Sequence, residues 1–424
     1  MRDFTGKKLL IIGSDPININ IVDAARDMGV YTIVVDGITD RTKAPAKTVA
    51  DEAWDIDYSK TDLIVEKCKE KGVDGVFAGY SEFRVLAACR IANKLGLPFY
   101  ANEEQINITR NKRIFKDYCL KYDISIPKDY CFSYPISNEE KSKIEYPVIV
   151  KPADYAGRKG ISVCLSSDDI DDAIEYAASK SQSKTIIVED YLDGVEFSSV
   201  YTVSNGKISL SAVNEKNITD DQEVKSGLCD FLISPAKSYH RYIEELDGKI
   251  REFIKGIKIN NGVVFFQGMV TDKKLYVFEM GYRINGNNDF YVIEKFNGIN
   301  FMKMMIAYSL CGDMCDDLSK DNPLYPQYAC SLLFYAHSGT IGTLQYEELL
   351  KHPNITDVKA QAQEGAQIAE DGSTGQCVLR LKLFGDTLEQ VKEIVEFAQN
   401  NVKVIDVEGK NMLFKPYDAN LLLK

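Results

Sequence analysis

The stretch that decides the fold is Tyr146-Pro147-Val148-Ile149-Val150-Lys151-Pro152, which is followed by Ala-Asp-Tyr-Ala-Gly-Arg-Lys-Gly-Ile at residues 153–161. The β-branched run predicts a short strand, and Lys151 lies at its rigid end. Gly157 and Gly160 let backbone N–H groups approach an anion, and Arg158 and Lys159 add positive charge. The stretch therefore predicts a polyphosphate site. The alternative is a surface hairpin whose basic residues serve only solubility.

The composition is that of a globular protein with several domains. The chain has 424 residues, of which 45% are hydrophobic and 27% charged, and this length favours two to four domains. A net charge of -12 argues against bulk binding to nucleic acid or to an anionic membrane, so any phosphate ligand must be held locally. The apolar run Leu9–Ile12 is too short for a signal-peptide core, and no stretch approaches a membrane span. We expect a cytoplasmic protein without nucleic-acid or membrane partners.

Cysteine and histidine usage excludes two common kinds of site. The ten cysteines are scattered without a CxxC pair, which predicts reduced thiols rather than a disulfide framework. The three histidines, His240, His337 and His352, do not share metal-ligand spacing. Zinc chemistry and a Ser-His-Asp triad are therefore not expected.

Residues 1–107 alternate strand and helix signals. Strands are predicted at residues 8–12, 31–35 and 73–78, and helices near residues 21–28 and 85–95. This pattern predicts a doubly wound α/β domain. Only Gly13 of a G-x-G-x-x-G fingerprint is present, so dinucleotide binding is not expected.

The rest of the chain predicts two further domains. A basic amphipathic helix at 109–120 precedes the Lys151 strand, and a helix at 170–178 and a strand at 185–189 follow it. Two hairpins are expected, one turning at Asn205-Gly206 and one at residues 271–274, and the second places Gln267 roughly opposite Glu279. The last hundred residues contain strands at 329–335 and 375–383 and a helix at 388–400, a smaller α+β pattern.

The order of these elements resembles the ATP-grasp superfamily, especially its carboxylate–amine ligase branch, which includes phosphoribosylamine–glycine ligase, biotin carboxylase and the L-amino-acid ligases. The resemblance covers nearly the whole chain. It implies an α/β domain at 1–107, an ATP-grasp domain at 108–318 with a mobile lid at about 148–205, and an α+β domain at 319–424. The implied cofactors are ATP and Mg²⁺ or Mn²⁺, and similar proteins commonly form homodimers.

The resemblance assigns nucleotide contacts to three segments. Lys112 and Lys151 would face the ATP phosphates, and the lid loop that covers them would contribute Asp154, Gly157, Lys159 and Gly160. The segment from Glu189 through Tyr191 and Leu192 would read adenine. Glu196 resembles the glutamate that accepts hydrogen bonds from the ribose hydroxyls, for which a carboxylate is suited because it offers only acceptors. The alternative for the two glutamates is a pair of surface acids.

The third segment is Phe278-Glu279-Met280-Gly281-Tyr282-Arg283, which resembles the family's metal-binding strand end. Glu279 would bind magnesium, with Gln267 as a neutral second ligand, and Arg283 would be catalytic, together with Lys151, by meeting the transferred phosphoryl group or the substrate carboxylate. Many members have an acid at the position of Gln267, and several have an asparagine at that of Gly281. These departures keep a non-catalytic nucleotide-binding protein open as an alternative.

Substrate contacts are expected from Asn285 and Asn287, with Glu82 as a second choice just after the predicted strand at 73–78. A polar Asn-Gly-Asn-Asn turn without a binding role is the alternative reading of the first two. The implied enzyme activates a small carboxylate as an acyl phosphate for attack by an amine, releasing ADP and phosphate. Phosphoribosylamine–glycine ligase or another enzyme of purine synthesis is the alternative within the family. The sequence does not identify the acid or the amine.

Overall fold

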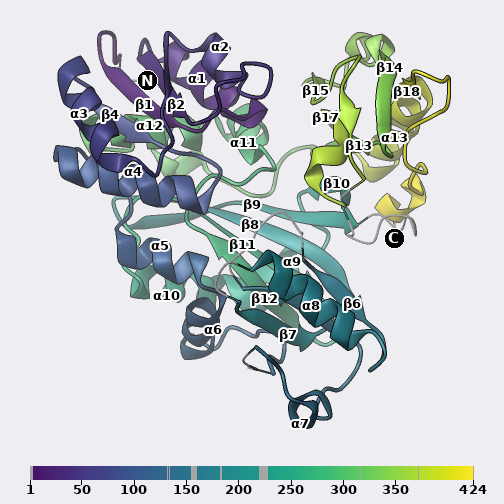
Figure 1. Ribbon diagram of the computed structural model, residues 1–424. Coiled ribbons are helices and arrows are strands. Elements are labelled where there is room, and N and C mark those ends of the chain that lie inside the picture. The colour runs from purple at the N-terminus through teal and green to yellow at the C-terminus, as the bar shows by residue number, and fades with distance from the viewer. Residues whose placement is uncertain are drawn as a thin grey trace.

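The computed structural model describes residues 3–130, 132, 134–153, 160–181, 184–218, 228–315, 317–370 and 372–423. A central eight-stranded sheet connects the parts of the molecule, with strand order β12-β11-β8-β9-β10-β13-β17-β15. In Figure 1 the N-terminal unit (purple) and the C-terminal part (green to yellow) lie above the long strands β8 and β9, and helix α8 lies below them. The expected mixed class, with α/β and α+β parts, is confirmed.

The N-terminal unit is a parallel four-stranded sheet with the order β3-β2-β1-β4. Its strands are β1 (Lys8–Ile12), β2 (Tyr31–Asp36), β3 (Glu52–Asp55) and β4 (Gly75–Phe77), and its helices are α1 (Ile19–Asp27), α2 (Ala46–Val49), α3 (Thr61–Lys71) and α4 (Glu82–Leu95). The run Leu9–Ile12 is fully buried, as expected for a strand covered on both faces. Helix α4 therefore begins at the carboxyl end of this sheet, directly after β4.

The predicted basic helix at 109–120 is wrong in one respect, because it is divided in two. Helix α5 (Glu103–Arg110) ends at Asn111, and α6 (Lys112–Lys121) begins there. Asn111 has an extended backbone, and its side chain accepts hydrogen bonds from the backbone N–H groups of Arg113 and Ile114. This N-cap starts a new helix at Lys112, since a side-chain acceptor satisfies the free amides of a first turn.

A separate small sheet carries the Lys151 strand. Strands β5 (Val148–Pro152), β6 (Ser162–Cys164) and β7 (Ile186–Asp190) pair in the antiparallel order β6-β5-β7, with α7 (Asn138–Lys141) before them and α8 (Ile170–Lys180) packed on β5. Buried residues from Phe132 to Val188 form a core of their own. We call residues 132–190 the lid. The lid has a hydrophobic core separate from that of the central sheet.

The central sheet contains both predicted hairpins. Strands β8 (Val195–Ser204) and β9 (Lys207–Ile218) turn at Asn205 and Gly206, whose φ angles of 50° and 77° are those of a type I′ turn, and β11 (Gly262–Val270) pairs with β12 (Leu275–Gly281). A nearly continuous helical segment lies between β10 (Cys229–Ser234) and β11 and consists of α9 (Tyr239–Tyr242), a π-helical turn (Ile243–Asp247) and α10 (Gly248–Gly256).

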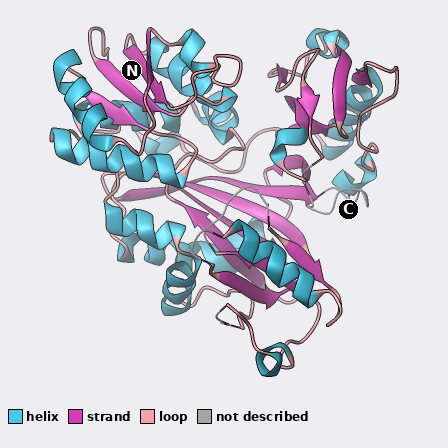
Figure 2. Ribbon diagram, viewed as in Figure 1, coloured by secondary structure: helices cyan, strands magenta, loops and turns pink. Residues whose placement is uncertain are grey.

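The C-terminal part adds strands to the central sheet and also forms a small sheet of its own. After α11 (Asp289–Asn297) and α12 (Phe301–Cys311), strand β13 (Tyr328–Tyr335) pairs with β10 on one side and with β17 (Cys377–Gly385) on the other, and β17 also pairs with β15 (Lys359–Ala360). A second sheet joins β14 (Gly339–Gln345), β16 (Gln367–Ile368) and β18 (Lys403–Asp406), and α13 (Leu388–Asn401) packs on β13 and β17. The strands form separate groups flanked by helices (Figure 2). The domain boundaries stay predictions. Strand β10, which precedes the predicted boundary at residue 319, is hydrogen-bonded to β13, which follows it.

Candidate active site

A buried charge cluster surrounds Lys151 at the end of β5. Its ammonium group donates a hydrogen bond to the Glu189 carboxylate of β7, whose other oxygen accepts one from Lys116 of α6 at 2.6 Å. Lys116 also donates to Asp129 at 2.6 Å. Lys151 is 7% exposed and Glu189 2% exposed. Two lysines and two carboxylates thus balance one another in a site largely closed to water.

The ionisation of the cluster follows from this environment. Burial lowers the pKa of Lys151, and the positive charges of Lys116 and Lys112 lower it further, while Glu189 opposes the shift. Burial acts to raise the pKa of Glu189, but the two neighbouring lysines outweigh it and the pKa of this carboxyl falls. Glu189 is therefore the negative charge that opposes the lowering of the Lys151 pKa. Three lysines gathered around one buried position suit a polyphosphate, which brings several negative charges.

Sequence reasoning missed Lys116. The residue lies four positions after Lys112, one helical turn further along α6, and this spacing places both on one face. The four-residue spacing from Lys112 was therefore the sequence signal that could have identified Lys116 as a second lysine of the site. What the sequence did not show is which face of the helix meets the lid.

The lid loop is only partly described. Gly160 has φ +82°, and a Cβ there would lie 3.1 Å from side-chain atoms of Lys180 and Pro152, so the position requires glycine. The expected contacts of Asp154, Gly157 and Lys159 lie outside the described residues. The phosphate role of the loop stays a prediction.

The expected adenine and ribose contacts follow β7. Tyr191 is 44% exposed, and its backbone N–H donates to the Pro147 carbonyl of the lid at 3.1 Å. Glu196 is buried on β8 and accepts a hydrogen bond from Lys216, its cross-strand partner on β9, at 2.6 Å. The sequence reading did not foresee this ion pair. Glu189 is not a surface acid either, since its carboxylate is buried against Lys151.

The predicted register of the second hairpin is confirmed. Gln267 of β11 lies directly opposite Glu279 of β12, and the register shifts after this pair, so that Gly268 faces Val277 and Phe278 is an extra residue. Such a β-bulge is common beside active sites because it re-aims a side chain. Ser198 of β8 and Asn214 of β9 continue the same row across the sheet. Directly opposed residues share a face, so a row of four polar side chains crosses this face of the sheet.

The lid and the central sheet meet at the bulge. The ammonium group of Lys151 lies 5.8 Å from the ring centre of Phe278, the residue before Glu279. Lys151 of the lid sheet therefore contacts the central-sheet strand that carries Glu279. A ligand placed between them would have cations on one side and metal-binding oxygens on the other.

The oxygen pair fits magnesium bound together with a phosphate ligand. Glu279 and Gln267 are both half-buried, and Glu279 makes no ion pair with a described residue. Within the described ranges no group of three or more His, Cys, Asp or Glu side chains is arranged for a metal. One carboxylate and one amide suffice where phosphate oxygens and water complete the octahedron, which is how magnesium commonly binds.

Packing explains why Gly281 replaces an asparagine. A Cβ at Gly281 would lie 2.4 Å from ring atoms of Phe265, its partner on β11. The same ring lies 5.1 Å from the Arg283 guanidinium, in cation–π contact. Phe265 therefore occupies the space that a side chain at 281 would need, and it supports Arg283 instead.

Arg283 and Glu82, predicted as separate site residues, are brought together. The Nε and Nη2 atoms of Arg283 both lie 2.5 Å from Oε1 of Glu82, and both side chains are largely buried. Glu82 is the first residue of α4, so the pair joins the N-terminal unit to the end of β12. A guanidinium held this way is pre-oriented for a second anion.

The asparagine-rich segment 285–289, which we call the Asn loop, has buried side chains at Asn285, Asn288 and Asp289 and is held by hydrogen bonds within the loop and from β9 and β17. Asn285 donates to Asp289 at 2.7 Å, and Asn214 of β9 donates to the other oxygen of Asp289 at 3.1 Å. Lys382 of β17 is 1% exposed and donates to the Asn287 carbonyl at 3.1 Å. Burial lowers the pKa of Lys382 to about 8. Residues 286–287 form a turn, with Gly286 exposed. Both the substrate role of the loop and the alternative of a polar turn without a binding role stay predictions.

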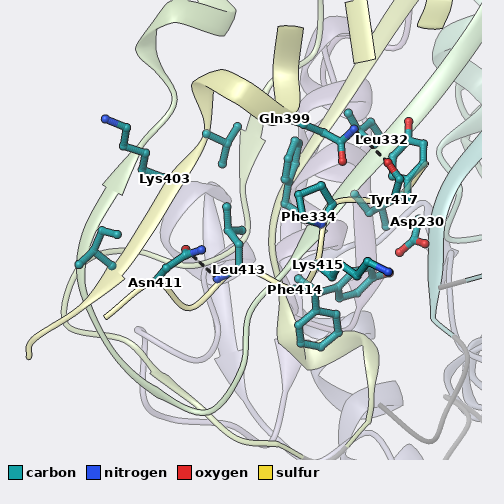
Figure 3. Close-up of a pocket in the computed structure, with 15 residues that line it drawn as sticks. Asp230, Leu332, Phe334, Gln399, Lys403, Asn411, Leu413, Phe414, Lys415 and Tyr417 are labelled. Atoms are coloured by element: carbon teal, nitrogen blue, oxygen red, sulfur yellow. Dashed lines mark hydrogen bonds between the residues drawn. The ribbon is translucent and has the colours of Figure 1, made fainter. Parts of the chain in front are cut away.

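A cavity of about 230 Å³ lies elsewhere, in the C-terminal part. It is formed by β13, α13, β18 and the final segment, and Figure 3 shows Phe334, Phe414 and Tyr417 around it, with Asp230 and Lys415 at one side. None of the residues predicted for nucleotide or metal lines it. We therefore assign the candidate active site to the lid and central sheet. No helix within the described ranges is long and apolar enough to cross a membrane.

Comparison with known proteins identifies the class. Residues 144–289, which hold the lid strands, the Gln267–Glu279 pair and the Asn loop, match the ATP-grasp domain. The resemblance expected from the sequence is therefore confirmed, and the chain contains an ATP-grasp domain.

Particular relatives agree with this class. Phosphoribosylamine–glycine ligase of Fusobacterium nucleatum is 26% identical over 239 residues, which are 53% of this chain and 53% of that enzyme, so the match spans about half the length of the relative. The L-amino acid ligase of Bacillus licheniformis superposes with a TM-score of 0.80 at 17% identity, covering 95% of this chain and 99% of that one. The biotin carboxylase domain dimer of Hydrogenobacter thermophilus 2-oxoglutarate carboxylase, in complex with MgADP, ADP and bicarbonate, gives 0.77 at 17% identity, covering 96% and 91%. The structural likenesses establish the fold. The relatives are all enzymes, as expected of ATP-grasp carboxylate–amine ligases.

Proposed function

We propose that this protein is an ATP-dependent ligase that activates a small carboxylate as an acyl phosphate and transfers the acyl group to an amine. In the first step a carboxylate oxygen forms a bond to the γ-phosphorus of ATP, and ADP leaves. In the second the amine nitrogen bonds to the acyl carbon, phosphate leaves, and the nitrogen loses a proton. The whole-chain activity is inferred, since the sequence match to the relatives is partial.

The observation that carries the proposal is the contact of Lys151, at the end of a lid strand, with Phe278, which precedes Glu279 on the central sheet. Lys151, Lys116 and Lys112 approach from the lid side, and Glu279 and Gln267 lie just beyond Phe278 on the other. Phosphoryl transfer needs charge neutralisation and positioning more than covalent help from the protein. This arrangement supplies both.

Each group of site residues has a separate proposed role. The lysines would neutralise the ATP phosphates, and the partly buried Arg283, held by Glu82, would orient the carboxylate or the transferred group. Mg²⁺, held by Glu279, Gln267 and phosphate oxygens, would supply further charge neutralisation. The closed surroundings of Lys151 and Glu189 exclude water, which strengthens each of these interactions.

The experiment is a screen of amino acids and phosphoribosyl compounds for ATP-dependent phosphate release. ADP and phosphate should appear, and hydroxylamine should trap the activated acid. AMP and pyrophosphate would show an adenylating mechanism and refute the proposal. Lys151→Ala should weaken ATP binding in calorimetry, whereas Lys128→Ala, which removes a lysine paired with the lid residue Glu145 on the surface, should leave it unchanged.

Two observations support alternatives within the same fold. A non-catalytic nucleotide-binding protein is favoured by the single carboxylate of the Gln267–Glu279 pair and by Gly281. Substrate-stimulated ADP release separates it from a ligase. The Fusobacterium relative favours a phosphoribosylamine–glycine ligase, but the first turn of the N-terminal unit is a poor phosphate site, since Asp15 there carries a negative charge and pairs with Arg84. A cytoplasmic location and a homodimer stay predictions.

A further inference from the structure

The junction between the Asn loop, the N-terminal unit and the C-terminal part contains buried polar atoms without hydrogen-bond partners among the described residues. They are Nδ2 of Asn287, Oδ1 of Asn288 and Nε of Arg380. Asn288 is 3% exposed. A buried donor or acceptor left unpaired costs about 1–3 kcal/mol, so several in one place indicate a ligand that completes them.

Three chain segments meet at this junction. Nη1 of Arg380 donates to the Gly286 carbonyl of the Asn loop at 2.7 Å. Lys359, the cross-strand partner of Arg380, donates to Asn20 of the N-terminal unit and to the Tyr291 hydroxyl, each at 2.8 Å. Figure 1 shows α11, which begins at Asp289, between the N-terminal unit and the segment that leads to the C-terminal part.

Tyr80 belongs to the same junction. Burial raises the pKa of its hydroxyl. A hydrogen bond from Asn20 and the nearby positive charge of Arg380 act to lower this pKa, but burial outweighs them. The phenol is therefore a neutral donor at physiological pH, and the guanidinium lies close to it.

The junction carries three basic side chains, Arg380, Lys382 and Lys359, beside two acids, Asp289 and Asp357. Neither Arg380 nor Lys382 makes an ion pair within the described ranges, and Lys382 is fully buried. Lys359 has only a loose pair with Asp357, at 3.7 Å. Asp289 accepts hydrogen bonds from the neutral amides of Asn214 and Asn285, so its negative charge remains and acts on Lys382. The basic groups of the junction outnumber its two acids. In a chain of net charge -12, such a local excess of cations indicates a bound anion.

The junction adjoins the proposed catalytic groups. Tyr80 lies two residues before Glu82, the partner of Arg283, and residues two apart have Cα atoms within about 7 Å. Asn287 lies four residues after Arg283. One small molecule can therefore reach both Arg283 and the junction.

We propose that Tyr80, Asn287 and Arg380 form an anion subsite that holds a second negatively charged group of the substrate, a carboxylate or a phosphate, while the carboxyl to be activated lies at Arg283. This inference rests on the proposed function for the identity of the ligand. It makes the C-terminal part a contributor to substrate choice. It also predicts that acids with a single charged group are poor substrates.

The test measures anion binding to the full-length protein without ATP. Succinate and inorganic phosphate are titrated separately in a calorimeter at constant ionic strength set with sodium chloride. At least one should bind, and Arg380→Gln should weaken it tenfold or more. Arg90→Gln, which removes a half-exposed arginine paired with Glu103, should change it less than twofold. Succinate binding identifies a carboxylate group and phosphate binding a phosphate group.

A second variant distinguishes a loss of anion binding from a loss of folding. Asn287→Asp has nearly the same shape but opposes an anion, and it should also weaken binding tenfold while keeping the wild-type melting temperature. Lys151→Ala should retain binding, which excludes occupancy of the ATP site. If neither anion binds better than chloride, or if both junction variants bind as wild type does, the subsite is refuted. ATP-dependent turnover without anion binding would refute this inference alone, and anion binding without ATP binding would refute the proposed function alone.

Discussion

Replacing Glu189 by glutamine should destabilise the lid and make the protein depend on a bound polyphosphate. The substitution keeps the shape of the side chain but leaves Lys151 and Lys116 with Asp129 as their carboxylate partner in the cluster. Both lysines are buried, and the pKa of Lys151 is already lowered by burial and by its positive neighbours. ATP should then stabilise the variant more than it stabilises wild type, because its phosphates replace the lost charge.

The magnitude follows from the contacts. At an effective dielectric constant of about 20, the attraction between charges at the 2.6 Å separation of Lys116 and Glu189 is roughly 6 kcal/mol before desolvation is counted. Removing one partner of a buried pair typically costs about 3–5 kcal/mol. The glutamine oxygen still accepts one hydrogen bond, so we expect a loss near the lower limit, about 3 kcal/mol. In a chain of this size that lowers the melting temperature by several degrees.

The assay is thermal unfolding at pH 7 with and without MgATP, with Glu145→Gln as the matched control. Glu145 is also a lid glutamate paired with a lysine, Lys128, but its side chain is 78% exposed, so its loss should change little. The folded-state pKa of Glu189 is lowered, so its stabilisation is present above the ordinary carboxyl pKa of about 4.3 and is lost as the pH falls through the folded value. Equal melting temperatures for the two variants at pH 7 would refute the reasoning.

Three further predictions concern the metal pair, the buried lysine of β17 and the lid glycine. Glu279→Gln should lower turnover by roughly 10²-fold or more, about 2.7 kcal/mol of transition-state stabilisation, and Gln267→Glu should tighten magnesium binding; magnesium titrations that are insensitive to the first change would place the metal elsewhere. The pKa of Lys382 is lowered to about 8, so the unfolded chain holds more protons above that pH, and the unfolding free energy of wild type should rise relative to Lys382→Met by about 2 kcal/mol from pH 7.5 to 9.5 in denaturant titrations; a constant difference would contradict this. Gly160→Ala, at φ +82°, should cost about 1 kcal/mol or more, whereas Gly248→Ala, in a helix with open space around it, should be neutral or stabilising, and equal melting temperatures would argue against strain at the lid.

Local patterns account for the elements that the sequence predicted well. The buried run at β1, the Asn205-Gly206 turn and the register of Gln267 with Glu279 depend on residues close in the chain. The divided helix at Asn111 was not foreseen, because its amphipathic pattern continues across a single N-cap. The strand-end position of Lys151 was predicted, but its partner Lys116 was not.

Long-range contacts account for what the sequence left open. Arg283 and Glu82 are 201 residues apart, and Lys382 donates to an Asn loop 95 residues earlier. Continuation of the central sheet into the last hundred residues depends on the pairing of β10 with β13, for which no turn lies between the strands to set a register. Nothing in local spacing specifies such pairs.

The sequence by itself determined the order of elements, the strand-end lysine, the hairpin that carries Glu279 and hence the ATP-grasp class, because each depends on periodicity and turn chemistry within a few residues. Only the tertiary structure decided which charges are buried together. Whether Glu189 is a surface acid or the counterion of two lysines, and whether Arg380 is a solvated arginine or part of a cationic junction, depends on which chain segments exclude water from them. Desolvation is a property of the packed molecule, and it changes the ionisation and the binding capacity of side chains whose identity the sequence had already given.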